Sequence, residues 1–144
     1  MKIAVDFDGT IVEHAYPKIG KERPFAISTL KRLQAEHHVL MLWSVREGKL
    51  LDEAVEFCKE RGLEFFSVNG EIQGEDFGTH NNKTRKIDAD MYIDDRNFGG
   101  LPDWGVIYDM ITNNWTFYDY FEKLYAEQED KPRGFWQRLF GKKD

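Results

Sequence analysis

Short apolar runs alternate with amphipathic helical segments along this chain, and that order constrains its fold more than any other feature. The apolar runs predict strands at 2–7, 39–43, 63–68, 91–93 and 104–108. Apolar residues at helical spacing predict helices at 24–36, 50–61 and 114–126, with a short helical piece at about 83–88. Strands that alternate with helices pair in parallel through right-handed crossovers. We therefore expect an α/β fold with an open, mostly parallel, Rossmann-like sheet and helices on both faces.

Acidic residues follow two of these strands at the point where each strand ends. Asp6 and Asp8 follow the first strand, where Gly9 opens a turn, and Asp94 and Asp95 follow the fourth. Ligands of open parallel sheets bind beyond the carboxyl ends of the strands. Four carboxylates gathered there would repel one another unless a cation lay between them. The sequence therefore predicts an acidic pocket that holds a metal ion.

Further residues extend this pattern into a familiar set of motifs. In chain order these are Asp6-x-Asp8-Gly9-Thr10, Ser44 after an apolar strand, Lys86 ahead of the fourth strand, and Tyr92-Ile93-Asp94-Asp95. Together they resemble the haloacid dehalogenase-like (HAD) superfamily of phosphotransferases over roughly residues 1–110. The segments around Ser44 and Asp94 also look like a small bacterial and phage subgroup that has no cap domain.

The resemblance implies a phosphomonoester hydrolase, an enzyme that uses Mg²⁺. Asp6 would be the nucleophile and form an aspartyl-phosphate. Asp8 would protonate the leaving oxygen and then deprotonate the hydrolytic water. The expected magnesium ligands are the side chains of Asp6, Asp94 and Asp95 and the backbone carbonyl of Asp8, since Mg²⁺ prefers oxygen ligands.

The same resemblance implies which groups bind the phosphoryl oxygens. They are the Ser44 hydroxyl, a lysine ammonium and the backbone N–H groups near Phe7. Lys86 is favoured over Lys83 because it stands eight residues before Asp94. Arg46 is expected either to bind substrate phosphate or to pair with a surface acid. Two further residues are expected in other roles, Arg96 in a structural salt bridge and His14 on the surface.

The intervals between the motifs leave no room for a cap. Ser44 lies 34 positions after Thr10, and Lys86 lies 42 positions after Ser44. One helix and one strand account for most of each interval. The expected substrates are small organic phosphates, such as sugar or nucleotide monophosphates, in an open pocket with little selectivity.

Alternative functions remain open at this stage. A receiver domain of two-component signalling would place an aspartate after its third strand, where this chain has Val68-Asn69-Gly70, so that order fails. A catalytically weak regulatory module that binds magnesium and phosphate is a second alternative. A phosphatase acting on a macromolecular phosphate end is a third.

Composition and charge bound the remaining expectations. The 144 residues predict one catalytic domain at 1–129 and a basic amphipathic tail at 130–144, which has five Lys/Arg against two Asp. The formal net charge of −6 argues against general nucleic-acid binding. We expect the tail to dock on the acidic domain of its own or a neighbouring chain, which leaves a homo-oligomer open.

Cellular location is predicted from the cysteine content and from the absence of targeting patterns. The lone cysteine, Cys58, excludes an internal disulfide and fits a reducing compartment, and its position predicts a buried thiol on a helix. No signal peptide precedes the first strand, and no apolar run approaches the ~18 residues of a membrane span. We therefore expect a cytoplasmic protein without a transmembrane segment.

Overall fold

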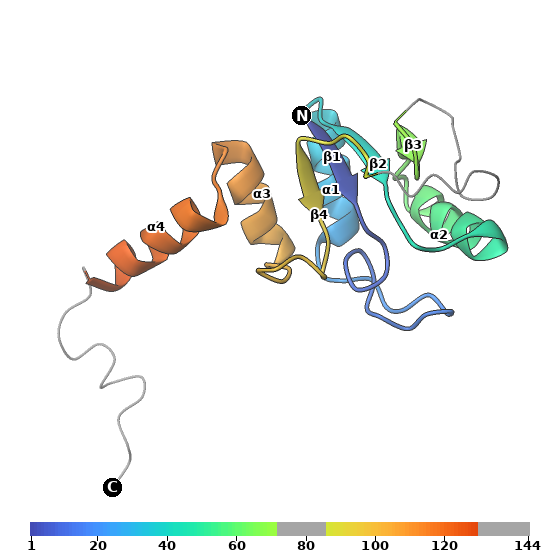
Figure 1. Ribbon diagram of the computed structural model, residues 1–144, viewed down its shortest axis with the longest axis horizontal. Helices are drawn as coiled ribbons and strands as arrows, with labels where there is room; N and C mark the ends of the chain where they lie inside the picture. The colour runs from blue at the N-terminus through green and yellow to red at the C-terminus, as the bar shows by residue number, and fades with distance from the viewer. Residues whose placement is uncertain (72–85, 130–144) are drawn as a thin grey trace, which may run out of the picture. The chain divides into compact units, whose positions relative to one another are not determined.

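The computed structural model describes residues 1–71 and 86–129 and contains an open sheet of four parallel strands (Figure 1). The strands are β1 (Lys2–Val5), β2 (Val39–Leu42), β3 (Ser67–Val68) and β4 (Met91–Ile93), in the spatial order β3-β2-β1-β4. The helices are α1 (Ala26–Ala35), α2 (Gly48–Glu60), α3 (Trp104–Asn113) and α4 (Phe117–Glu129). The predicted open, parallel α/β sheet is confirmed.

Two of the predicted strands differ from the structure. The predicted strand at 104–108 is wrong, because this segment begins α3. Trp104, Ile107, Met110 and Ile111 are buried, which is helical spacing that a five-residue apolar window cannot reveal. The predicted strand at 63–68 is shortened to the two residues of β3.

The end of α2 explains why β3 starts late. Gly62 has φ of 78°, and its N–H donates to the carbonyl of Lys59. The N–H of Leu63 donates to the carbonyl of Cys58, which completes a Schellman motif. Leu63 is thereby buried at the helix end and takes no part in the sheet. Cys58 is buried as predicted, and burial raises the pKa of its thiol to about 12.

The strand register brings the carboxyl ends of all four strands to one edge. Val5 pairs with both Leu42 and Ile93, and Leu42 also pairs with Val68. The residues that come directly after these four are Asp6, Trp43, Asn69 and Asp94. From β1 the chain continues to β2 and β3 on one side, and it then returns to β4 on the other side of β1. The strand order therefore reverses at the carboxyl ends of β1 and β4, which is the topological switch point.

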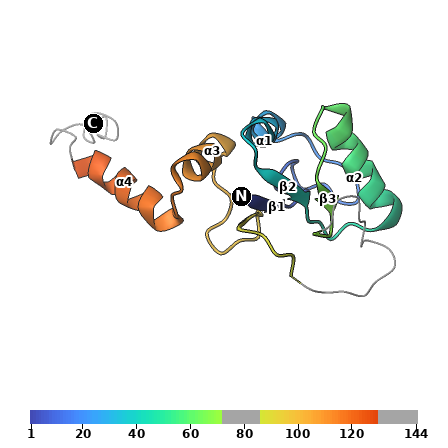
Figure 2. The same cartoon turned by 90° about the horizontal axis from the view of Figure 1, so that it is seen from above.

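The two faces of the sheet are covered differently. The crossovers that contain α1 and α2 run in the same direction along the sheet, so right-handed connections place both helices on one face (Figure 2). On the other face Ala4 and Met41 form a cluster with Ile87, against which Trp43 and Tyr92 pack. Of the predicted helical piece at 83–88, residues 83–85 lie outside the described residues, and residues 86–88 are not helical.

The contacts divide the chain into two compact units, Met1–Tyr108 and Asp109–Asp144. The division falls within α3, whereas the sequence placed a boundary after residue 129. The predicted basic tail at 130–144 lies outside the described residues. No helix among the described residues is long and apolar enough to cross a membrane.

The buried indole of Trp104 stabilises the loop that carries the acidic motif. Its Nε1–H donates to the carbonyl of Thr10 over 3.1 Å, and both residues are buried. Trp104→Phe leaves that acceptor unpaired, which should lower the free energy of unfolding by about 1–3 kcal/mol. Urea denaturation measures the loss, with Trp115→Phe in the other unit as the matched control. An effect no larger than that of the control would contradict this role.

Candidate functional site

The three carboxylates predicted to bind a metal meet at the switch point of the sheet. Asp6 follows β1, and its N–H continues the ladder by donating to the carbonyl of Ile93. Asp94 and Asp95 follow β4 directly. One oxygen from each of Asp6, Asp94 and Asp95 lies within 4.8 Å of the other two. Adjacent parallel strands therefore bring together acids that are almost ninety residues apart.

Thr10 joins the ends of β1 and β4 at this cluster. Its hydroxyl donates to Oδ2 of Asp6 over 2.9 Å and accepts from the N–H of Asp95 over 3.0 Å. Gly9 adopts φ of 83°, and a Cβ at this position would lie 2.3 Å from Oδ2 of Asp95. The turn therefore requires glycine for its conformation and for the close approach of Asp95.

Burial and the mutual repulsion of the carboxylates in the cluster both act on the pKa of Asp6. Burial and the neighbouring Asp94 carboxylate raise the pKa of Asp6 to about 7. The Thr10 hydroxyl and the backbone of Phe7 oppose this shift through hydrogen bonds to the carboxylate. The backbone N–H of Phe7, which the sequence assigned to substrate phosphate, thus contacts Asp6 in this structure.

Asp8 belongs to a different part of the site. Both of its carboxylate oxygens accept from Arg46, Oδ2 from Nε and Oδ1 from Nη2, each over 2.7 Å. Arg46 is fully buried, and Asp8 is only 7% exposed. The Asp8 side chain is therefore held in a bidentate ion pair and is not part of the carboxylate cluster.

The remaining donors of Arg46 are also occupied. Nη1 donates to the carbonyls of Pro17 and Leu50, and Nη2 donates to that of Lys18. The hydrogen bond to Asp8 raises the pKa of Arg46 further above its usual value. With all five N–H groups paired inside the protein, Arg46 has no donor for a substrate phosphate. Arg46 was expected to bind substrate phosphate or to pair with a surface acid. In the structure it pairs instead with Asp8, a buried acid of the first motif.

Ser44 lies in the loop after β2 and is oriented by two neighbours. Its N–H donates to Oδ1 of Asn69 over 2.7 Å, and its hydroxyl oxygen accepts from the N–H of Arg46 over 3.1 Å. Asn69 follows β3 and has φ of 52°. From the sequence, Asn69 served only as an argument against a receiver domain, and its role at the site was not predicted. Its position directly after a predicted parallel strand could have indicated that role.

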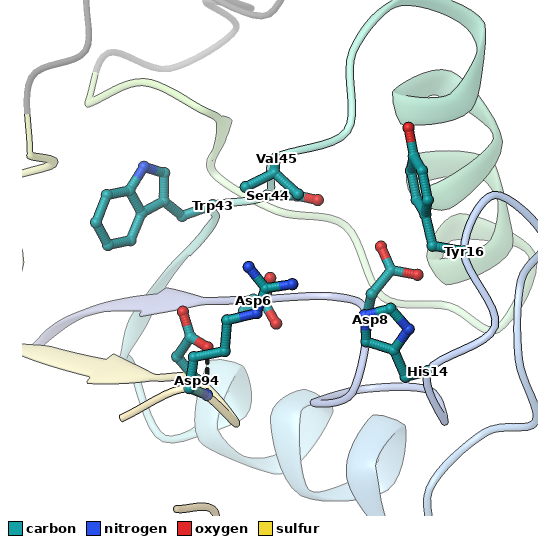
Figure 3. A pocket seen from close by; sticks show the side chains of 9 residues that line it. Asp6, Asp8, His14, Tyr16, Trp43, Ser44, Val45 and Asp94 are labelled. Atoms are coloured by element: carbon teal, nitrogen blue, oxygen red, sulfur yellow. Dashed lines mark hydrogen bonds between the residues drawn. The ribbon is translucent and has the colours of Figure 1, made fainter. Parts of the chain in front are cut away.

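A pocket of about 490 Å³ opens over these residues (Figure 3). Its acidic lining consists of Asp6, Asp8 and Asp94, and Ser44 adds a hydroxyl. The other lining side chains are His14, Tyr16, Trp43, Val45 and Arg96. His14 is exposed, as expected, and also lines the pocket. Arg96, expected in a structural salt bridge, lines the pocket as well. Among the described residues, no carboxylate forms an ion pair with the Arg96 side chain.

Lys86 does not line this pocket. Its Nζ lies 4.5 Å from the ring centre of Tyr92, and the residue is exposed. The alternative, Lys83, lies outside the described residues. The structure therefore brings Arg96, and not Lys86, to the acidic pocket.

The donor set at the switch point fits a small divalent cation. Carboxylate oxygens are the ligands that Mg²⁺ prefers, and one oxygen from each of three carboxylates lies within 4.8 Å of the other two. A cation among them would be held by all three. It would also offset the repulsion that raises the pKa of Asp6. Asp6, Asp94 and Asp95 are the side chains that would hold it.

One solved structure is similar to this chain over most of its length. It is described as the structure of the conserved protein coded by a locus from Bacteroides thetaiotaomicron. The two chains share 61% sequence identity with a TM-score of 0.76, and the match covers 83% of this chain and 96% of the other. This chain therefore belongs to the same family as that conserved protein. No family model matches the sequence, and no curated protein matches it.

The raised pKa of Asp6 predicts a pH dependence of stability in chelator. The folded pKa of about 7 exceeds the unfolded value of about 3.9, so the folded state binds this proton more tightly. The resulting stabilisation is complete below about pH 4 and is lost as the pH rises through about 7. Between pH 5.5 and 8, the urea midpoint should fall more steeply for the wild type than for Asp6→Asn.

The same urea denaturation also tests for binding of Mg²⁺. Added Mg²⁺ should raise the midpoint of the wild type at pH 8, because a ligand that binds only the folded state stabilises it. Equal pH slopes in the two proteins, together with no response to Mg²⁺, would contradict a cation site at Asp6.

Proposed function

We propose that this chain, and the family that it shares with the conserved Bacteroides protein, hydrolyses small phosphate monoesters through an aspartyl-phosphate on Asp6. One observation carries the proposal. A carboxylate at the switch point of a parallel sheet lines a pocket and lies against two further carboxylates. The HAD-like motifs noted in the sequence place the nucleophile at this position.

The chemistry assigned to Asp6 has two displacements at phosphorus. An Asp6 oxygen attacks, the Asp6 O–P bond forms, and the ester P–O bond breaks as the leaving oxygen takes a proton. Water then attacks the aspartyl-phosphate, loses its proton, and releases inorganic phosphate and the free carboxylate. Thr10 supports this role because its hydroxyl fixes one carboxylate oxygen of Asp6. Mg²⁺ bound beside Asp6 would neutralise charge on the carboxylate and on the phosphoryl oxygens.

Asp8 is the group to which we assign the proton transfers. It lines the same pocket as Asp6. Since both of its oxygens accept hydrogen bonds from Arg46, one of these bonds must loosen before Asp8 exchanges a proton with substrate or water.

The Arg46–Asp8 pair also favours a second candidate function. A carboxylate that accepts two charge-assisted hydrogen bonds is well positioned, but these bonds hinder it from accepting or donating a proton. A catalytically weak module that binds magnesium and phosphate would tolerate this pairing fully. Turnover of a simple phosphate ester separates the two candidates.

Binding of the phosphoryl group is assigned to Ser44 and Arg96. Both line the pocket, and the Arg96 side chain has no carboxylate partner among the described residues. A guanidinium presents several donors to phosphate oxygens in a planar array. Lys86 would have to leave the ring of Tyr92 to take this role.

The first test of this function is turnover of an aryl phosphate with Mg²⁺. The wild type should release inorganic phosphate, and excess chelator should abolish the activity. Asp6→Asn should be inactive while keeping a native circular dichroism spectrum, since it removes the nucleophile and keeps the side-chain volume. Asp52→Asn, on the exposed side of α2, is the matched control and should retain activity. Full activity in chelator or in Asp6→Asn would exclude the proposed chemistry.

A second test compares the two candidate cations. Arg96→Ala should lower kcat/KM by roughly 100-fold, the scale for losing one donor to a developing charge. Lys86→Ala, which removes an exposed cation outside the pocket, should have a much smaller effect. Steady-state kinetics on the same aryl phosphate gives both values. The reverse order would return the phosphate-binding role to Lys86.

A further inference from the structure

Two aromatic side chains stand on the walls of the pocket, and phosphoryl transfer at Asp6 requires neither of them. Tyr16 and Trp43 both line the cavity. Figure 3 shows them on opposite sides of Asp6 and Ser44. With the phosphoryl group placed at Asp6, these rings are surfaces that the rest of the substrate would meet. They are therefore candidates for recognising the leaving group.

The wall formed by Tyr16 is anchored through the backbone of the two residues that follow it. The buried Arg46 donates to the carbonyls of Pro17 over 3.2 Å and of Lys18 over 2.9 Å. The guanidinium carbon of Arg46 also lies 5.3 Å from the centre of the Tyr16 ring. Tyr16 nevertheless remains 50% exposed. A half-exposed ring on an anchored backbone loses little conformational entropy when a ligand stacks on it.

The opposite wall is braced from behind. The ring of Trp43 lies 5.5 Å from that of Tyr92, with the planes tilted by 52°. The hydroxyl of Tyr92 in turn donates to the carbonyl of Ile87. Trp43 therefore has a partner within the protein, whereas the exposed area of Tyr16 is open to a ligand.

We propose that the pocket selects phosphate monoesters whose leaving group carries a planar ring, and that Tyr16 stacks on that ring. This inference rests on the proposed phosphatase function and defines its substrate class. It also replaces the expectation of an unselective pocket, because the aromatic walls supply contacts outside the phosphoryl group.

The chemistry of the walls favours a ring over a bare sugar. Tyr16, Trp43 and Val45 offer ring faces and apolar surface. The acids and Ser44 are committed to the metal and the phosphoryl group in the proposed mechanism. Apart from His14 and the Tyr16 hydroxyl, these walls offer sugar hydroxyls few partners to replace water, and burying an unpaired hydroxyl is costly. The cavity of about 490 Å³ is within the range of small-molecule sites.

Two matched substrate pairs test the preference in the wild-type protein. The first pair is a nucleoside 5′-monophosphate and ribose 5-phosphate, which share the phosphoryl-ribose unit. The second is benzyl phosphate and cyclohexylmethyl phosphate, which differ in the planarity of the ring. The planar member should have a kcat/KM about 5- to 100-fold higher, the scale of one stacked base.

The two pairs also identify the source of the ring. A preference for the planar member in the first pair alone identifies a nucleoside as the leaving group. A preference in the second pair alone identifies an aryl group. A preference in both pairs supports ring stacking in general. Turnover of all four substrates without a preference overturns the inference and leaves the proposed function standing. If no substrate is turned over, the proposed function fails. The ring preference is then measured as the ratio of dissociation constants within each pair, by calorimetry with Mg²⁺, and equal constants overturn it.

Variants of Tyr16 test the stacking residue. Tyr16→Leu should lower the preference ratio by at least 5-fold, whereas Tyr16→Phe should keep it, because stacking needs the ring and not the hydroxyl. Tyr125→Leu, an exposed tyrosine of α4, is the matched control. An unchanged ratio in Tyr16→Leu, or equal losses in Tyr16→Phe and Tyr16→Leu, would overturn the assignment to Tyr16.

Discussion

The buried ion pair between Arg46 and Asp8 is the interaction on which the site depends. Through it, Arg46 connects three segments that the sequence separates: the motif after β1, the loop after β2, and Pro17 and Lys18. Breaking such a pair by removing one partner typically costs about 3–5 kcal/mol, because the other charge stays buried and unpaired. The desolvation cost of burying the Arg46 guanidinium is offset, because every one of its N–H groups has an acceptor. A solvated surface arginine could not position these segments in this way.

Around this pair the pocket has a floor and walls with different chemistry. The floor is acidic, and Thr10 holds it together by linking Asp6 to the backbone of Asp95. The walls are aromatic, and the arginine that holds Asp8 also holds the backbone of Pro17 and Lys18, directly after Tyr16. Arg46 therefore positions both Asp8, to which the proton transfers are assigned, and the segment beside Tyr16, to which ring recognition is assigned. Under the proposed function, these walls supply the contacts that select the substrate.

Much of the fold followed from local patterns. The apolar runs that became β1 and β2 were found because their side chains are buried almost continuously. The run that became β4 was found although only Ile93 in it is fully buried. Gly62 marked the end of α2 because only a residue that tolerates positive φ suits a Schellman turn. The segment at 104–108 failed for the opposite reason. Its five residues are apolar enough for a strand, and only the burial of Met110 and Ile111 further along reveals the helical period.

The sequence by itself determined the parallel α/β sheet and the meeting of Asp6, Asp94 and Asp95 at its edge. These follow from hydrophobic periodicity and from acids at strand ends, which are local features. Only the tertiary structure decided that Arg46 pairs with Asp8, that Arg96 and not Lys86 faces the pocket, and that Tyr16 forms a wall. The physical reason is that a long side chain can reach several partners. Which partner it binds depends on how distant segments pack and which acceptors they leave buried.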